Sequence, residues 1–202
     1  MGRTARMRNL FDQYSQPENR LSHALAVCLD EDRALLQGFL AWVGVRSPVR
    51  AKDLLIVEQS LPGDPPESET ETERRGLPDI VVHDDNRWCL LVESKVQASL
   101  TEDQLRRHER TLRRRGFEQI HRVALTKSGV RAPKGTIAVT WSGLYEWLGM
   151  AGQRGEWSDR LRAYLRAAEV RLAQEEYLTE GTLTMFDGFP FSDDNPYTYG
   201  EA

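Results

Sequence analysis

Two carboxylates and a lysine stand at the ends of two apolar runs in this sequence. Asp79 precedes the run 80–82, while Glu93 and Lys95 follow the run 88–92. The polar residues between the runs suit a hairpin turn, which would bring Asp79 and Glu93 close together. Because side chains alternate along a strand, Glu93 and Lys95 would project from the same face.

Such a group suits the hydrolysis of phosphodiester bonds. A divalent cation assists this reaction by neutralising charge and lowering the pKa of bound water. Mg²⁺ prefers oxygen ligands, usually one or two carboxylates with water completing the shell. We interpret Asp79 and Glu93 as ligands of Mg²⁺ or Mn²⁺, with the backbone carbonyl of Ser94 as a third ligand. Lys95 could orient or deprotonate the attacking water, or stabilise developing charge.

The same residues also have a plain structural interpretation. Pro-Asp and Glu-x-Lys occur by chance in many charged proteins, and Glu and Lys two residues apart on a strand can form a solvated face. The context of Glu93 favours the metal site, because an apolar run that calls for burial precedes it. A predicted helix carrying Gln104 follows at short distance.

Hydrophobic periodicity predicts the elements that position these residues. Helices are predicted over 17–29, 32–43, 101–115, 141–150 and 157–177, and strands over 54–59, 79–82, 88–95, 120–126 and 136–140. Thr101 is expected to cap its helix, with Gln104 completing a capping box, and Gly116 is expected to end that helix. This order predicts an α/β domain with a mixed central β-sheet flanked by helices.

The chain of 202 residues is long enough for one domain and a tail. We expect an N-terminal segment over 1–16 and the α/β domain over 17–178. Within the domain, residues 62–76 are rich in Pro, Glu, Ser and Thr and predict a mobile acidic loop. Residues 179–202 predict an irregular tail, either packed on the domain or leading into a second domain.

Composition argues against membrane and secreted classes. No apolar run approaches the ~20 residues that span a bilayer, so no membrane partner is expected. The N-terminus lacks the apolar core of a secretory signal. Cys28 and Cys89 lie singly inside apolar segments and are expected to be reduced core thiols. Together these observations predict a cytoplasmic protein.

The net charge of -4 conceals an uneven distribution. Residues 64–73 hold five acids and no base, whereas residues 106–115 hold six arginines and one acid. Arg106, Arg110 and Arg113 would cluster on one side of the predicted helix. They could contact phosphates of a nucleic acid, or form only a solvated helix face, and the sequence favours neither interpretation.

The motifs together resemble the PD-(D/E)xK nuclease superfamily, over residues 18 to about 140. The resemblance is carried by Pro-Asp at 78–79, by Glu-Ser-Lys at 93–95 and by Asp-Gln-Leu at 103–105. It is also carried by Glu-Asn-Arg-Leu at 18–21, which opens the first long helix. The form is most similar to bacterial nuclease-like members of that superfamily. It implies a restriction-endonuclease-like core, in which a mixed sheet is flanked by helices.

The resemblance also implies a role for each matched residue. Asp79 and Glu93 would bind Mg²⁺, and Lys95 would serve the attacking water. Glu18 would add to the metal site, directly or through a water molecule, and Gln104 would orient the strand or the substrate.

Two positions depart from the usual pattern, and one further acid competes for a place in the site. Ser94 stands where an apolar residue is usual, and His108 stands where a tyrosine is common. Glu58, at the end of the first predicted strand, could face the same cleft as Asp79. The resemblance favours Glu18 over Glu58.

The sequence therefore predicts a metal-dependent nuclease that hydrolyses DNA, in defence against foreign DNA or in repair. Nothing in the sequence separates RNA from DNA as the substrate. A rival hypothesis is a catalytically inactive module of the same fold that binds or regulates a partner. A homodimer, or a further partner domain, is compatible with either hypothesis.

Overall fold

The computed structural model describes residues 17–59, 78–96, 100–127, 129, 132–150, 152 and 155–180, with side chains described from 18 to 169. The N-terminal segment predicted at 1–16 and the acidic loop predicted at 62–76 lie outside these residues. Residues 181–202 of the predicted tail also lie outside them.

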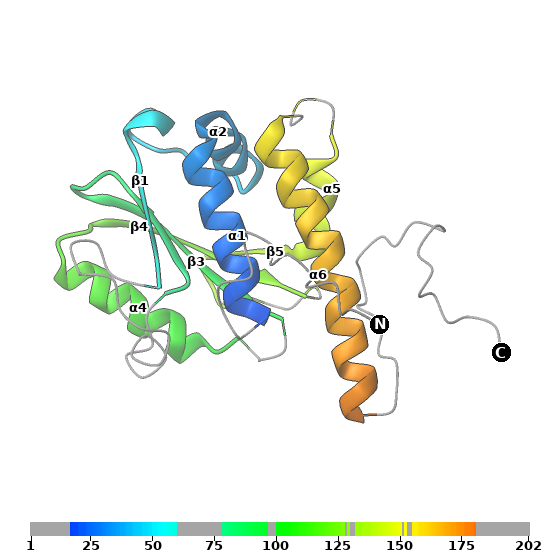
Figure 1. Cartoon of the computed structure of the whole chain (residues 1–202). Helices are drawn as coiled ribbons and strands as arrows, with labels where there is room; N and C mark the ends of the chain where they lie inside the picture. Colours follow the sequence, from blue (N-terminus) through cyan, green and yellow to red (C-terminus); the bar gives the residue numbers. More distant parts are fainter. Residues whose placement is uncertain are drawn as a thin grey trace.

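The described chain forms helices and strands in the expected order (Figure 1). Their bounds are α1 Pro17–Glu31, α2 Arg33–Trp42, η1 Ala51–Asp53, β1 Leu55–Glu58, β2 Ile80–His83, β3 Trp88–Lys95, α4 Glu102–Arg114, β4 Gln119–Thr126, β5 Thr136–Thr140, α5 Trp141–Leu148 and α6 Glu156–Glu180. The predicted helices and strands are confirmed to within a few residues at each end. The short 3₁₀ helix η1 was not expected.

A five-stranded sheet in the order β1-β2-β3-β4-β5 forms the centre of the domain. Strands β1, β2 and β3 pair antiparallel, whereas β3, β4 and β5 pair parallel. The expected mixed central sheet flanked by helices is therefore confirmed. In the β2–β3 ladder Ile80 pairs with Val92, so Asp79, one residue before β2, lies beside Glu93.

The turn between β2 and β3 fixes this register. The Asp84 carboxylate accepts hydrogen bonds from the backbone N–H groups of Asn86, Arg87 and Trp88. Asp85 takes a φ of 57°, a left-handed conformation that Asp tolerates better than most residues. The predicted hairpin turn is confirmed, and its geometry sets which residues meet at the far end of the two strands.

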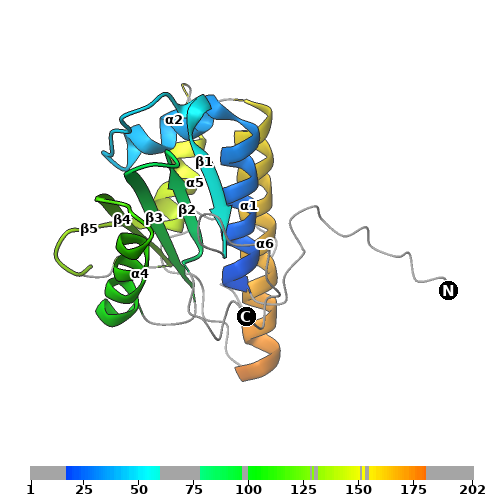
Figure 2. The same cartoon turned by 90° about the vertical axis from the view of Figure 1, so that its left-hand side faces the viewer.

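Helices cover both faces of the sheet (Figure 2). Along β3, Leu90 and Val92 belong to the larger core, which includes residues of α1, α2, α5 and α6. Cys89 and Leu91 point to the opposite face and pack with Leu105 of α4 in a smaller core. Because the alternation continues, Glu93 and Lys95 point to the same side of the sheet as α4.

Both cysteines are buried and free, as expected for core thiols. Burial raises the pKa of Cys28 and of Cys89 to about 12, so neither thiol ionises at neutral pH. Among the described helices, none is long and apolar enough to cross a membrane.

Candidate active site

Asp79 is held against the end of β3 by a backbone hydrogen bond. Its Oδ2 accepts from the N–H of Ser94 at 2.6 Å, and only 9% of the residue is exposed. Its carbonyl accepts from the N–H of Gln59, which joins the end of β1 to the same point. Two strands therefore fix Asp79 beside Glu93, as the hairpin predicted.

Glu93 is almost fully buried, and its two oxygens have different surroundings. Oε1 lies 3.0 Å from Nζ of Lys95 and also accepts a hydrogen bond from Nε2 of Gln104. Oε2 is buried and has no hydrogen-bond partner among the described residues. One oxygen of Glu93 is thus fixed by the protein, and the other lies 3.5 Å from Nε2 of His108 without a hydrogen bond.

Gln104 reaches Glu93 because α4 begins close to the end of β3. Thr101 caps the helix as predicted, its Oγ1 accepting from the backbone N–H of Gln104 at 3.3 Å. The Gln104 side chain donates from Nε2 to Glu93, and its part in a capping box stays a prediction. The predicted end of the helix at Gly116 is confirmed, with a φ of 100° there.

Glu18 reaches the site from α1 on the other side of the sheet. Its Oε1 accepts from the backbone N–H of Val96 at 2.9 Å, just beyond Lys95. Its charge contributes to raising the pKa of both Asp79 and Glu93, although burial is the largest cause for each. The structure therefore brings Glu18 to the same end of β3 as the two predicted ligands.

Glu58, the competing acid, takes a different partner. Its Oε2 lies 2.7 Å from Nδ1 of His23 on α1. Glu58 pairs in register with Ile80 and so shares the α1 face of the sheet, opposite to Asp79 and Glu93. Of the two candidate acids, the structure brings Glu18 rather than Glu58 to the group.

Burial and mutual repulsion shape the charges of the two central acids. Burial raises the pKa of Asp79 well above its ordinary value, and the neighbouring Glu93 carboxylate raises it further. Burial also raises the pKa of Glu93, against the opposing effect of Lys95. Burial alone would lower the pKa of Lys95, but the charges of Glu93 and Asp79 outweigh it and raise that pKa. Lys95 is therefore a cation that can donate hydrogen bonds at neutral pH.

His108 is a site residue that the sequence presented only as a departure from a pattern. It lies one helical turn after Gln104, is 1% exposed, and places Nε2 3.5 Å from Oε2 of Glu93. Burial, with added effects of Arg107 and Lys95, lowers the pKa of His108 to about 4, so the ring is neutral at neutral pH. The feature of the sequence that could have predicted this place is the spacing of four residues between Gln104 and His108.

The arginines of α4 divide into two groups. Arg106 pairs with Glu102 and Arg113 pairs with Glu109, each four residues away along the helix. Arg110 is exposed and has no ion-pair partner among the described residues. Arg107 is also exposed, and its charge acts to lower the pKa of Glu93. It follows Gln104 by three residues, which places it on the side of α4 that borders the acids.

The residues present fit a single hard cation. Two neighbouring carboxylates, one of them with an orphaned buried oxygen, supply the oxygen ligands that Mg²⁺ prefers. Within the described ranges, no group of three or more His, Cys, Asp or Glu side chains is arranged to hold a metal ion. Mg²⁺ does not require such a cage, because it keeps several waters and binds through one or two carboxylates.

Comparison with known proteins agrees with the geometry. A family model described as the PD-(D/E)XK nuclease superfamily matches residues 8–166, which is most of the chain. Comparisons with curated proteins and with solved structures gave no match. The matched range includes Asp79, the strand that carries Glu93 and Lys95, and the helices that carry Glu18 and Gln104. The chain belongs to the PD-(D/E)XK nuclease superfamily.

Proposed function

We propose that this protein is a Mg²⁺-dependent nuclease that hydrolyses phosphodiester bonds of DNA, and that Mn²⁺ can replace Mg²⁺. The observation that supports this most is the buried pair Asp79 and Glu93. One Glu93 oxygen is fixed by Lys95 and Gln104, and the other has no hydrogen-bond partner among the described residues. Membership of a nuclease superfamily supports a role for that pair in phosphodiester hydrolysis.

Each residue then has a distinct task. Asp79 and Glu93 would hold the cation, with the Ser94 carbonyl as a further ligand and Glu18 supporting through water. When bound, the cation would neutralise phosphate charge and lower the pKa of a water molecule. Lys95, protonated beside Glu93, would orient the attacking water by a hydrogen bond and stabilise negative charge in the transition state.

Two further residues of α4 would keep Glu93 in its productive orientation. Gln104 holds Oε1, so that Glu93 cannot rotate away from Asp79. His108 fills the buried space beside Oε2 as a neutral ring.

The substrate would lie along α4. Arg106, Arg110 and Arg113 remain proposed phosphate contacts, and the structure adds Arg107 beside the acids. Arg107 and Arg110 have the freer guanidinium groups, because Arg106 and Arg113 already pair with glutamates. We propose DNA as the substrate, with RNA as the alternative, and a cytoplasmic role in defence or repair. A homodimer would allow both strands to be cut.

Site variants test this function directly. Asp79→Ala and Lys95→Ala should each abolish Mg²⁺-dependent cleavage of DNA while the circular dichroism spectrum stays unchanged. Lys134→Ala, which removes an exposed lysine, should cleave like the wild-type protein. Undiminished cleavage by both site variants would contradict the proposal.

The rival function is a catalytically inactive module of the same fold. Its support is the acidic pI of about 5.7, which is unusual for a protein that binds nucleic acid. Calorimetry with Mg²⁺ and Mn²⁺ separates the two. Metal binding by the wild-type protein that is lost in Asp79→Ala supports the nuclease, and no binding by a folded wild-type protein supports the rival.

A further inference from the structure

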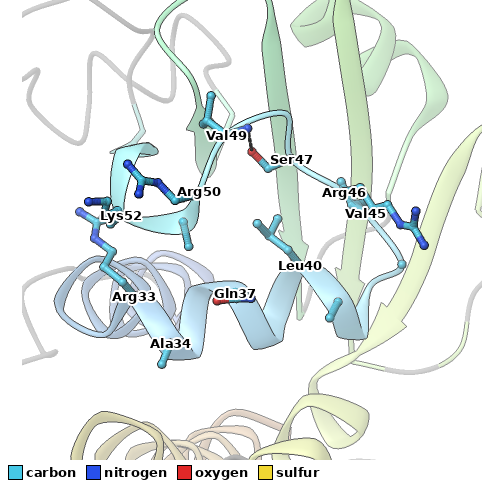
Figure 3. A pocket seen from close by; sticks show the side chains of 13 residues that line it. Arg33, Ala34, Gln37, Leu40, Val45, Arg46, Ser47, Val49, Arg50 and Lys52 are labelled. Carbon is cyan, nitrogen blue, oxygen red and sulfur yellow. Dashed lines mark hydrogen bonds between the residues drawn. The ribbon is translucent and has the colours of Figure 1, made fainter.

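A basic hollow lies between α2 and the chain segment that leads to η1 (Figure 3). Its volume is about 1160 Å³. The residues that line it include four cations, Arg33, Arg46, Arg50 and Lys52, and no acid. In a chain whose net charge is -4, a concave surface lined only by positive charges is a local exception.

The hollow is separate from the candidate active site. Arg33, at its edge, pairs with Asp30 near the end of α1, whereas Glu18 stands at the start of that helix. Asp30 follows Glu18 by twelve positions in α1, which is about 18 Å along the axis. A ligand in the hollow would therefore not touch Asp79, Glu93 or Lys95.

Three of the cations gather at one end of the hollow. In the view of Figure 3, Arg33, Arg50 and Lys52 lie toward one side of the hollow, while Arg46 lies toward the other. Lys52 is exposed and has no ion-pair partner among the described residues. Asp30 and Asp53 offset part of this charge by pairing with Arg33 and Arg50, which leaves Lys52 as the unpaired cation of this end among the described residues.

The two arginines of this end are held in place and still keep free donors. Arg33 donates to the Leu54 carbonyl at 3.2 Å and pairs with Asp30 at 2.7 Å. Arg50 uses only Nε for Asp53, at 3.1 Å, so both of its terminal amino groups remain available. A guanidinium fixed in this way loses little freedom on binding and presents several N–H groups to phosphate oxygens.

Two apolar residues of the lining belong to the core. Leu40 and Val45 are 5% and 4% exposed, and Leu40 points into the hollow from α2. Gln37 lies beside it with its amide along the helix. The hollow thus combines its cations with small, polar and nearly buried apolar residues, so the phosphates are the part of a ligand that this lining would recognise.

We propose that this hollow is a second, phosphate-binding site, whose cationic end of Arg33, Arg50 and Lys52 takes the phosphates of a nucleotide-like ligand. The phosphates could belong to a free nucleotide or to a nucleic-acid chain, since the chemistry of recognition is shared. The proposal does not depend on the nuclease function, because it involves none of the active-site residues.

A matched pair of double variants tests the site by calorimetry in EDTA. Arg50→Gln with Lys52→Gln removes one exposed ion-paired arginine and one unpaired cation from the hollow. Arg87→Gln with Arg166→Gln removes an exposed arginine paired with Glu118 and an exposed arginine without a described partner, neither of which lines the hollow. The probes are tripolyphosphate, ATP and short oligothymidylate. Unchanged thermal unfolding confirms that both variants are folded.

The wild-type protein should bind at least one probe. The hollow variant should weaken that binding about tenfold or more, and the control variant by less than about twofold. Weakened ATP or tripolyphosphate binding identifies a free phosphate ligand, and weakening confined to oligothymidylate identifies a nucleic-acid backbone. Binding of no probe, or equal weakening by the two variants, would overturn the proposal.

Discussion

At the scale of one residue, the surroundings of Glu93 favour metal binding and lower the stability of the folded protein. Its buried Oε1 is shared by Lys95 and Gln104, while its buried Oε2 has no hydrogen bond in the described structure. A second acid, Asp79, lies beside it and is also buried. Burying two neighbouring carboxylates is unfavourable without a cation between them, so the arrangement suits metal binding better than stability.

Replacing Asp79 with asparagine should therefore stabilise the protein while inactivating it. The Asp79→Asn side chain would keep an oxygen for the Ser94 N–H and remove the repulsion between two carboxylates. In EDTA at neutral pH we expect the free energy of unfolding to rise by about 1 kcal/mol, because the pKa of Asp79 is raised in the folded state. Denaturant titration measures this, and a parallel assay should show no Mg²⁺-dependent cleavage. A less stable Asp79→Asn variant would show that the two acids do not repel each other in the folded protein.

Site residues that are placed by local geometry can be predicted from the sequence more readily than site residues that are placed by packing between elements. Asp79, Glu93 and Lys95 could be placed because a hairpin and the strand period are enough to bring them together. The choice between Glu18 and Glu58 depends on how α1 packs over the sheet, which periodicity does not define. The place of His108 in the site was not predicted, because its partner, Glu93, is on another element.

At the scale of the element, α4 has three sides with different surroundings. Leu105 and Leu112 pack in the smaller core, Gln104 and His108 meet Glu93, and the arginines face outward. Its boundaries were predictable from Thr101 and Gly116, because caps are local. The direction of the Gln104 side chain was not, because it depends on a buried acid eleven residues earlier in the chain.

Arg107 should contribute more to substrate binding than its neighbour Arg106. Arg107 lies near Glu93, whereas Arg106 is already paired with Glu102. We expect Arg107→Gln to raise KM for DNA about three- to tenfold and to reduce the salt dependence of binding by about one phosphate contact. Arg106→Gln is the matched comparison and should raise KM by a smaller factor, because Glu102 already pairs with Arg106. Equal effects of the two variants would argue for a diffuse charge effect of the whole helix.

The cap of α4 should affect both stability and activity. Thr101→Ala removes the acceptor of the Gln104 N–H and should destabilise the protein by about 1 kcal/mol. Because the same turn holds the Gln104 side chain on Glu93, Mg²⁺-dependent cleavage should also fall. Thr101→Ser keeps the hydroxyl and should retain both properties. Normal cleavage by a destabilised Thr101→Ala variant would show that the cap does not affect the active site.

At the scale of the whole molecule, α6 places a further buried acid against the domain. Glu169 is 4% exposed, and its Oε1 has no hydrogen-bond partner among the described residues. Burial raises its pKa from the ordinary value of 4.5 to about 8, against the opposing charge of Lys127. The folded protein therefore keeps a proton on Glu169 at pH values where the unfolded chain has lost it.

This difference gives the pH dependence of stability a definite sign. The free energy of unfolding should fall as pH rises through the window from 4.5 to about 8, because the folded state binds the extra proton. The contribution of one group cannot exceed about 1.4 kcal/mol per pH unit. Glu169→Gln removes it, so the variant should gain stability relative to the wild-type protein between about pH 5 and pH 9. Urea titrations at several pH values measure this. If the free energies of unfolding of the wild-type protein and of Glu169→Gln changed in parallel with pH, the assignment would be contradicted.

The most direct test of the metal site proposed for this nuclease is the anomalous scattering of Mn²⁺ in crystals of the wild-type protein. We predict one strong peak against the carboxylates of Asp79 and Glu93, on the side of the orphaned Oε2, with Lys95 and Glu18 close by. The peak should be absent from crystals of Asp79→Asn grown under the same conditions. A Mn²⁺ ion bound elsewhere, or no ion beside Glu93 at saturating Mn²⁺, would contradict the account.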